Sequence, residues 1–167
     1  MFRHQEDPCF LPLMAVAETV CRSAAVLREM AVYYDPAGQP GRVARLHTFS
    51  ATARGQEEQL AEQLRRAFLT PLEREDLALI MRHLRRIPAA AETAGRLISA
   101  AAFPALLPEE QEWMTLFEEG CCEVRRLVEA LPRATKEKAS DQADRMLSWY
   151  AVSYTHLRAH ETSLHLV

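Results

Sequence analysis

Cysteine and histidine are the side chains of this sequence that are most able to do chemistry, but their spacing matches no known catalytic motif. The four cysteines form no CxxC pair, and the adjacent Cys121 and Cys122 have no histidine beside them in a motif. The sequence also contains no glycine-rich phosphate loop, no GxSxG motif and no paired ExxH motifs of di-metal bundles. We therefore expect a protein that is not an enzyme. All four cysteines, which include Cys9 and Cys21, should be small apolar side chains of a protein in a reducing compartment.

Three of the six histidines, His156, His160 and His165, lie in the last part of the chain, residues 152–167. His160 and the following glutamate begin an HExxH-like pattern, but His165 is one residue too far away to share a helical face with His160. Residues 152–162 look like the translation, in one reading frame, of a transposase adapter used in sequencing libraries. We therefore predict that 152–167 is a non-native tail and assign it no function. If the tail is natural, its histidines become candidate ligands.

Residues 70–76 combine a helix-start signal with a cluster of charges. Thr70 as N-cap, Pro71 at the first helical position and Glu73 three residues after the cap predict a capping box. Glu75 and Asp76 would then lie in the first turn, where acids complement the helix dipole. A partner-recognition cluster is the alternative interpretation of these charges.

A second charged group consists of Arg82, Arg85 and Arg86, which share one helical face. This face could contact an acidic partner, a phosphate or an anionic lipid, although a solvated surface is the commoner outcome. His47 and His83 have no carboxylate partner in the same motif, so we expect them to be exposed or half-buried.

The elements that must position these residues are helices. The chain has 167 residues, is rich in Ala, Leu, Glu and Arg, and contains only five glycines. Apolar residues recur at helical spacing, and this predicts helices at about 11–34, 42–68, 70–98, 109–131 and 133–150. The Pro- and Gly-containing segment 35–41 should separate the first two, and Pro88 should interrupt and kink the third.

Charge and hydropathy exclude several classes of function. The net charge of −3 and the pI of about 6.1 argue against a nucleic-acid-binding protein. Charges interrupt the apolar stretches before roughly 18 residues, so we expect no insertion into a membrane. The N-terminus does not have the pattern of a secretion signal, and we expect a cytoplasmic location.

Residues 68–77, read as FLTPLEREDL, resemble the F-I-T-P-x-D-R-E-D-I signature of the PhoU-like accessory proteins of Pit-type phosphate permeases. The residues that match this signature are Phe68, Thr70, Pro71, Glu73, Arg74, Glu75 and Asp76. Residues 46–54, 84–87 and 139–145 are similar to further segments of the same family, so the resemblance covers about residues 10–150.

The resemblance implies an all-α domain, 1–151, built of tandem three-helix bundles. The first bundle would span 10–103, and the second, 105–151, would be incomplete because its last helix is missing. Such a truncation would uncover apolar helix faces, so we also expect a tendency to form homo-oligomers.

The resemblance also implies a metal site, but this chain departs from it. Ser50 and Arg54 replace two family carboxylates, Arg85 and Arg86 replace two more, and an arginine at a ligand position repels a cation. We therefore expect no cofactor. Residual metal binding through Asp141 and Asp144, with Glu57 and Glu58, is the alternative.

The function that the resemblance implies is regulation of inorganic phosphate transport by a non-catalytic protein that binds a Pit-type permease. Such a protein would be cytoplasmic, or peripheral at the inner face of the membrane through the permease. The alternative functions are a metal-binding helical bundle that uses the remaining carboxylates, and a non-functional fragment.

Overall fold

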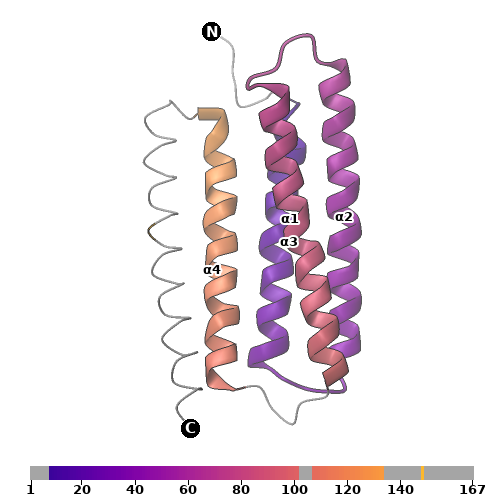
Figure 1. Cartoon of the computed structure of the whole chain (residues 1–167), viewed down its shortest axis with the longest axis vertical. Coiled ribbons are helices and arrows are strands. Elements are labelled where there is room, and N and C mark those ends of the chain that lie inside the picture. Colours follow the sequence, from indigo (N-terminus) through magenta and orange to yellow (C-terminus); the bar gives the residue numbers. More distant parts are fainter. Residues whose placement is uncertain (1–7, 102–106, 134–147, 149–167) are drawn as a thin grey trace.

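The computed structural model describes residues 8–101, 107–133 and 148 of the chain. In this part the chain forms an all-α bundle of α1 (Phe10–Val32), α2 (Gln39–Arg66), α3 (Arg74–Ala101) and α4 (Pro108–Ala130), shown in Figure 1. A short 3-10 turn, η2 (Leu131–Arg133), follows α4. The predicted all-α fold class is confirmed. Of the predicted fifth helix, 133–150, the described part contains only Arg133 and Ser148.

Helix α1 is the central helix of the bundle. It packs against α2, α3 and α4, and α2 also packs against α3. Figure 1 shows α2 and α4 on opposite sides of α1. The side chains of Leu13, Val16, Val20 and Met30 are completely buried. A helix that is apolar around most of its circumference is stable only when neighbours cover it on several sides, as they do here.

Helix α1 is also long and apolar enough, by length and composition, to cross a membrane. The expectation that charges interrupt every apolar stretch too early was therefore too strict, because Glu18 and Arg22 leave an 18-residue window that passes this test. Within the bundle, 61% of that window is buried, and the core helix of a soluble protein passes the same test.

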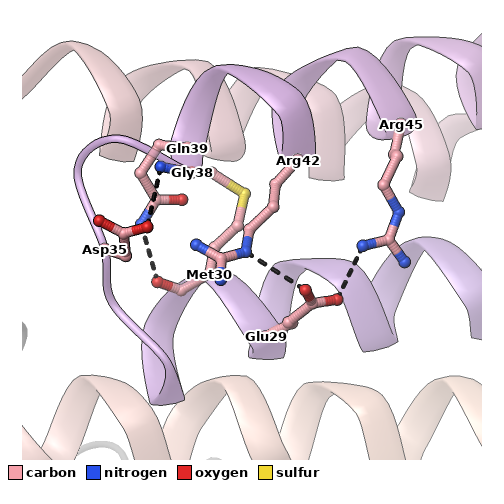
Figure 2. Close-up of polar contacts among 7 residues, drawn as sticks. All are labelled: Glu29, Met30, Asp35, Gly38, Gln39, Arg42 and Arg45. Carbon is pink, nitrogen blue, oxygen red and sulfur yellow. Dashed lines mark hydrogen bonds and ion pairs between the residues drawn. The ribbon is translucent and has the colours of Figure 1, made fainter.

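The turn between α1 and α2 is held by polar contacts (Figure 2). The Asp35 carboxylate accepts a hydrogen bond from the Gly38 backbone N–H at 3.1 Å, and Gln39 Nε2 donates to the Met30 carbonyl oxygen at 3.1 Å. Helix α2 starts at Gln39, three residues earlier than predicted, because Pro40 occupies the first turn of the helix instead of the turn before it. Proline suits that position, where its missing N–H would have no partner.

Glu29 joins α1 to the first turns of α2. Its carboxylate oxygens accept hydrogen bonds from Arg42 Nε at 3.3 Å and Arg45 Nη1 at 2.9 Å (Figure 2). Burial alone would raise the pKa of Glu29, but the hydrogen bonds from Arg45 and Arg42 outweigh that effect and lower it. The carboxylate is therefore stabilised in its charged form.

The middle of α2 has few apolar residues, and polar contacts with the neighbouring helices lie there instead. Gln56 exchanges hydrogen bonds with the Thr19 hydroxyl of α1, at 3.1 and 3.2 Å. Glu57 forms an ion pair with Arg85 of α3 at 2.7 Å. Leu46 and Leu60, which precede and follow this region in α2, are buried.

At Gly95, helix α3 packs closely against side chains of α1 and α2. A Cβ atom at this position would overlap the Leu46 side chain and would lie 3.2 Å from the Met30 sulfur. The absence of a side chain therefore lets three helices meet. Pro88 is buried inside an unbroken α3. The prediction that Pro88 interrupts this helix is therefore wrong.

Helix α4 begins at Pro108, and the Glu110 carboxylate accepts a hydrogen bond from the Leu107 backbone N–H at 2.8 Å. Its extensive helix contact is with α1. Part of the predicted second bundle, residues 105–106, 134–147 and 149–151, lies outside the described part. The division into bundles at 10–103 and 105–151 therefore stays a prediction.

Candidate functional site

The segment between α2 and α3 contains the residues of the signature. Helix α2 ends at Arg66, and Ala67 has extended backbone geometry, so the chain leaves the helix there. Helix α3 begins only at Arg74, and its first backbone hydrogen bond runs from Leu77 N–H to the Glu73 carbonyl at 3.1 Å. Residues 67–73 thus form a loop, which we call the signature loop.

The predicted capping box at Thr70 is wrong. Because α3 starts at Arg74, Glu73 is the residue that precedes the helix, and Thr70 and Pro71 lie in the signature loop, both half-buried. Glu75 and Asp76 lie in the first turn of α3, as predicted, where they complement the helix dipole. The local sequence pattern was compatible with either start, and only the path of the chain from α2 distinguishes them.

Arg74 has a structural role that the sequence did not indicate. Its guanidinium group donates hydrogen bonds to the carbonyl oxygens of Leu64 at 3.0 Å and Ala67 at 2.7 Å. These carbonyls belong to the end of α2, which has no further helical turn to bond with. Arg74 therefore caps α2 and at the same time ties it to the start of α3, which closes the base of the signature loop.

The signature loop exposes apolar side chains. Phe68 is 94% exposed, Leu69 is 81% exposed and Leu72 is 37% exposed. The helix predicted at about 42–68 would have included Phe68, but α2 ends two residues earlier, at Arg66. The result is an aromatic and an aliphatic side chain presented to solvent next to each other on a loop with a fixed base.

The three arginines predicted to share a face of α3 have different environments in the structure. Arg85 Nε lies 2.7 Å from Glu57 Oε2 of α2, so its charge is neutralised within the bundle. Arg82 and Arg86 are exposed, and so is His83, as expected. The surface of α3 that follows the signature loop therefore carries two arginines rather than three.

A polar cluster lies on the α2–α3 seam around Glu92. His47 Nδ1 is 2.9 Å from the Glu92 carboxylate and Arg96 Nη2 is 2.5 Å from it. Burial alone would raise the pKa of Glu92, but hydrogen bonds from His47, Arg96 and Ser50 lower it to about 2. His47 is exposed, as predicted, but its carboxylate partner is 45 positions away in the sequence and was missed.

One member of this cluster, Ser50, is at a position where the resemblance implies a metal ligand, and Arg54 is at another. Ser50 is buried and donates a hydrogen bond to Glu92, while Arg54 is exposed. Among the residues that the structure describes, no three His, Cys, Asp or Glu side chains come together in a way that could hold a metal ion. Asp141 and Asp144 lie outside the described residues, so the prediction about them stays untested.

A cleft of about 390 Å³ opens between α1 and α2. It is lined in part by Glu29 and Arg45, which pair with each other, and by Thr48. The Arg22 guanidinium lies over the Phe49 ring, 5.1 Å from its centroid. Because its charged side chains are engaged in these contacts, we assign no ligand to the cleft.

Compared with family models, with curated proteins and with solved structures, the chain matches none of them.

Proposed function

We propose that this chain is a non-catalytic accessory protein that regulates inorganic phosphate transport by binding a Pit-type permease. The proposal starts from the resemblance of residues 68–77 to the signature of the PhoU-like accessory proteins. The structural observation that carries it is the exposure of Phe68 and Leu69 on the signature loop.

Exposed aromatic side chains of this kind are typical anchors of protein interfaces. Large apolar side chains are usually buried, and a few aromatic anchors supply much of the binding energy of an interface. The signature loop also meets the second requirement of an anchor, a fixed position. Arg74 bonds the end of α2, so little conformational freedom at the base of the loop would be lost on binding.

The surface beside the loop would contribute charge complementarity. Arg82 and Arg86 are exposed on α3, about two to three helical turns after its start. They would contact acidic groups of the permease or anionic lipid around it, and this would mainly increase the rate of association. The signature loop would supply most of the affinity for the permease, and the two arginines would help to orient the protein as it binds.

The proposal is tested by binding of the full chain to a Pit-type permease from the same source, reconstituted in nanodiscs. We expect replacement of Phe68 and Leu69 together by serine to weaken binding at least tenfold, which corresponds to about 1.4 kcal/mol. The matched control is Leu97→Ser, because Leu97 is 66% exposed on α3, away from the loop. Equal binding by the loop variant and the control would contradict the proposed role of the loop.

A further inference from the structure

Two cysteines that are far apart in the sequence meet at the interface of α1 and α4. The Sγ atoms of Cys21 and Cys122 are 2.7 Å apart, and both side chains are half-buried. Both are free thiols in this structure. A disulfide bond has a sulfur–sulfur distance of about 2.05 Å, so less than 1 Å of movement separates this contact from a covalent bond.

Ion pairs on either side of the cysteines hold the two helices in register. Arg125 Nη1 of α4 lies 3.0 Å from Glu18 Oε2 of α1, one helical turn before Cys21. Arg28 of α1 pairs with Glu118 of α4 on the other side. The contacts run in opposite order along the two helices, as an antiparallel pair requires. The cysteines are therefore brought together by a packed interface and not by one side-chain rotamer.

The neighbouring cysteine on α4 has a different environment. Cys121 is only 4% exposed and belongs to the apolar core, whereas Cys122 is partly accessible to solvent. Burial of the Cys121 side chain limits the access of reagents and also raises the pKa of its thiol to about 12. A small reagent in solution therefore reaches Cys122 and Cys21 more readily than Cys121.

We propose that Cys21 and Cys122 are a thiol–disulfide switch that reacts with low-molecular-weight disulfides and covalently joins α1 to α4. In the first step one cysteine, as thiolate, attacks a sulfur of the small disulfide and releases one small thiolate. The second cysteine then loses its proton and attacks the mixed disulfide at the protein sulfur, and a second small thiolate leaves. The protein loses two electrons and two protons, and the small disulfide becomes two small thiols.

Among the residues that the structure describes, α4 is the helix of the bundle that the bond would tie more firmly to its neighbours. The extensive contact of α4 is with α1, whereas α1, α2 and α3 all pack against one another. A bond between positions 21 and 122 closes a loop of about one hundred residues, so it restricts the unfolded chain strongly. The oxidised chain should therefore be more resistant to unfolding than the reduced chain.

Burial, together with the hydrogen bond to Cys122, raises the pKa of the Cys21 thiol to about 12. The Cys21 thiol is therefore protonated at neutral pH, and its reaction with a disulfide should accelerate as the pH rises, because the thiolate is the nucleophile. This makes the switch slow at pH 7 and faster at pH 9.

The test is incubation of the full chain with oxidised glutathione at pH 9, followed by mass spectrometry and peptide mapping. Cleavage after glutamate separates Cys9 from Cys21, because Glu18 lies between them. We expect a loss of two hydrogen atoms, a linked peptide that contains Cys21, and a rise in Tm of roughly 5–10 °C that a reductant reverses.

Two variants at adjacent positions identify the second cysteine. Cys121→Ala should keep both the link to Cys21 and the rise in Tm, and Cys122→Ala should lose both. A chain that keeps four free thiols, a link that survives in Cys122→Ala, or glutathione remaining on Cys21 in the wild-type chain would each overturn the proposal. If either variant fails to fold, fragmentation of the linked wild-type peptide between Cys121 and Cys122 decides which cysteine is joined to Cys21.

Discussion

Arg85 of α3 lies with its Nε atom 2.7 Å from Oε2 of Glu57 on α2, and this ion pair bridges the middle of the α2–α3 seam. In the family that the sequence resembles, the corresponding position of α3 is an acid, and acids on neighbouring helices can share a metal ion. Here the arginine forms an ion pair with the carboxylate instead. The exposed fractions of the two side chains are 31% and 38%, so we expect the pair to contribute well under 1 kcal/mol to stability.

The first prediction concerns metal content. The Glu57 carboxylate is already paired with Arg85, and the Glu92 carboxylate is paired with Arg96 and His47. We therefore expect the purified chain to contain less than one iron, zinc or nickel ion per chain. Elemental analysis by mass spectrometry after gel filtration measures this. One or more metal ions per chain would favour the alternative of a metal-binding bundle, with Asp141 and Asp144 as the first residues to replace.

The second prediction concerns Arg74. Replacement by alanine removes two hydrogen bonds to the end of α2, and we expect the free energy of unfolding to fall by about 1–2 kcal/mol. Arg74→Lys should recover little of this loss, because an ammonium group does not reproduce the forked geometry of the guanidinium. Urea unfolding measures the difference. The control is Arg82→Ala, an exposed arginine of the same helix, which should change stability by less than about 0.5 kcal/mol.

The third prediction compares two glycines. Gly95→Ala places a methyl group against the side chains of Leu46 and Met30, and we expect a loss of about 1–3 kcal/mol from overpacking. Gly55→Ala meets nothing within 4 Å and lies within α2, so it should stabilise the chain by up to about 1 kcal/mol. Thermal unfolding of the two variants gives the comparison. Shifts in the same direction would show that the helices are not packed as described.

The fourth prediction concerns acid stability and Glu92. The pKa of Glu92 is lowered from its ordinary value of 4.5 to about 2 in the folded chain, so between these values the unfolded state binds more protons than the folded state. Stability from this group is therefore present above about pH 4.5 and is lost as the pH falls towards 2. We expect a loss of about 1 kcal/mol over this range, since the site is near the surface.

Glu92→Gln should be less stable than wild type at pH 7, and the difference should shrink at pH 3. Urea unfolding at the two pH values measures this. A difference that stays constant between pH 7 and pH 3 would mean that the Glu92 carboxylate has an ordinary pKa in the folded chain.

The helices of the fold could be predicted from the sequence because their signals are local. The apolar stripe of α3, which includes Leu77, Met81, Leu84 and Ala91, recurs at helical spacing and is buried as expected. The start of α3 could not be predicted, because Thr70 and Pro71 make a favourable local cap that the path of the chain does not use. Propensity is a weak signal when tertiary contacts, here those of Arg74, stabilise a different boundary.

The contacts between helices could not be predicted, because they join residues with no pattern in common. His47 and Glu92 are 45 positions apart, and Cys21 and Cys122 are 101 positions apart. No spacing rule connects such pairs, and only the three-dimensional arrangement of α1, α2, α3 and α4 brings them together. The exposure of Phe68 was not predicted, because the apolar pattern of the second helix includes Phe68 although α2 ends at Arg66.

The most direct test of the proposed function is equilibrium binding of the labelled full chain to nanodiscs that contain the Pit-type permease, compared with empty nanodiscs of the same lipid. We predict saturable binding to the permease nanodiscs only, and competition by unlabelled wild-type chain but not by the chain with serine at positions 68 and 69. Equal binding to empty and permease-containing nanodiscs, or no binding to either, would contradict the account.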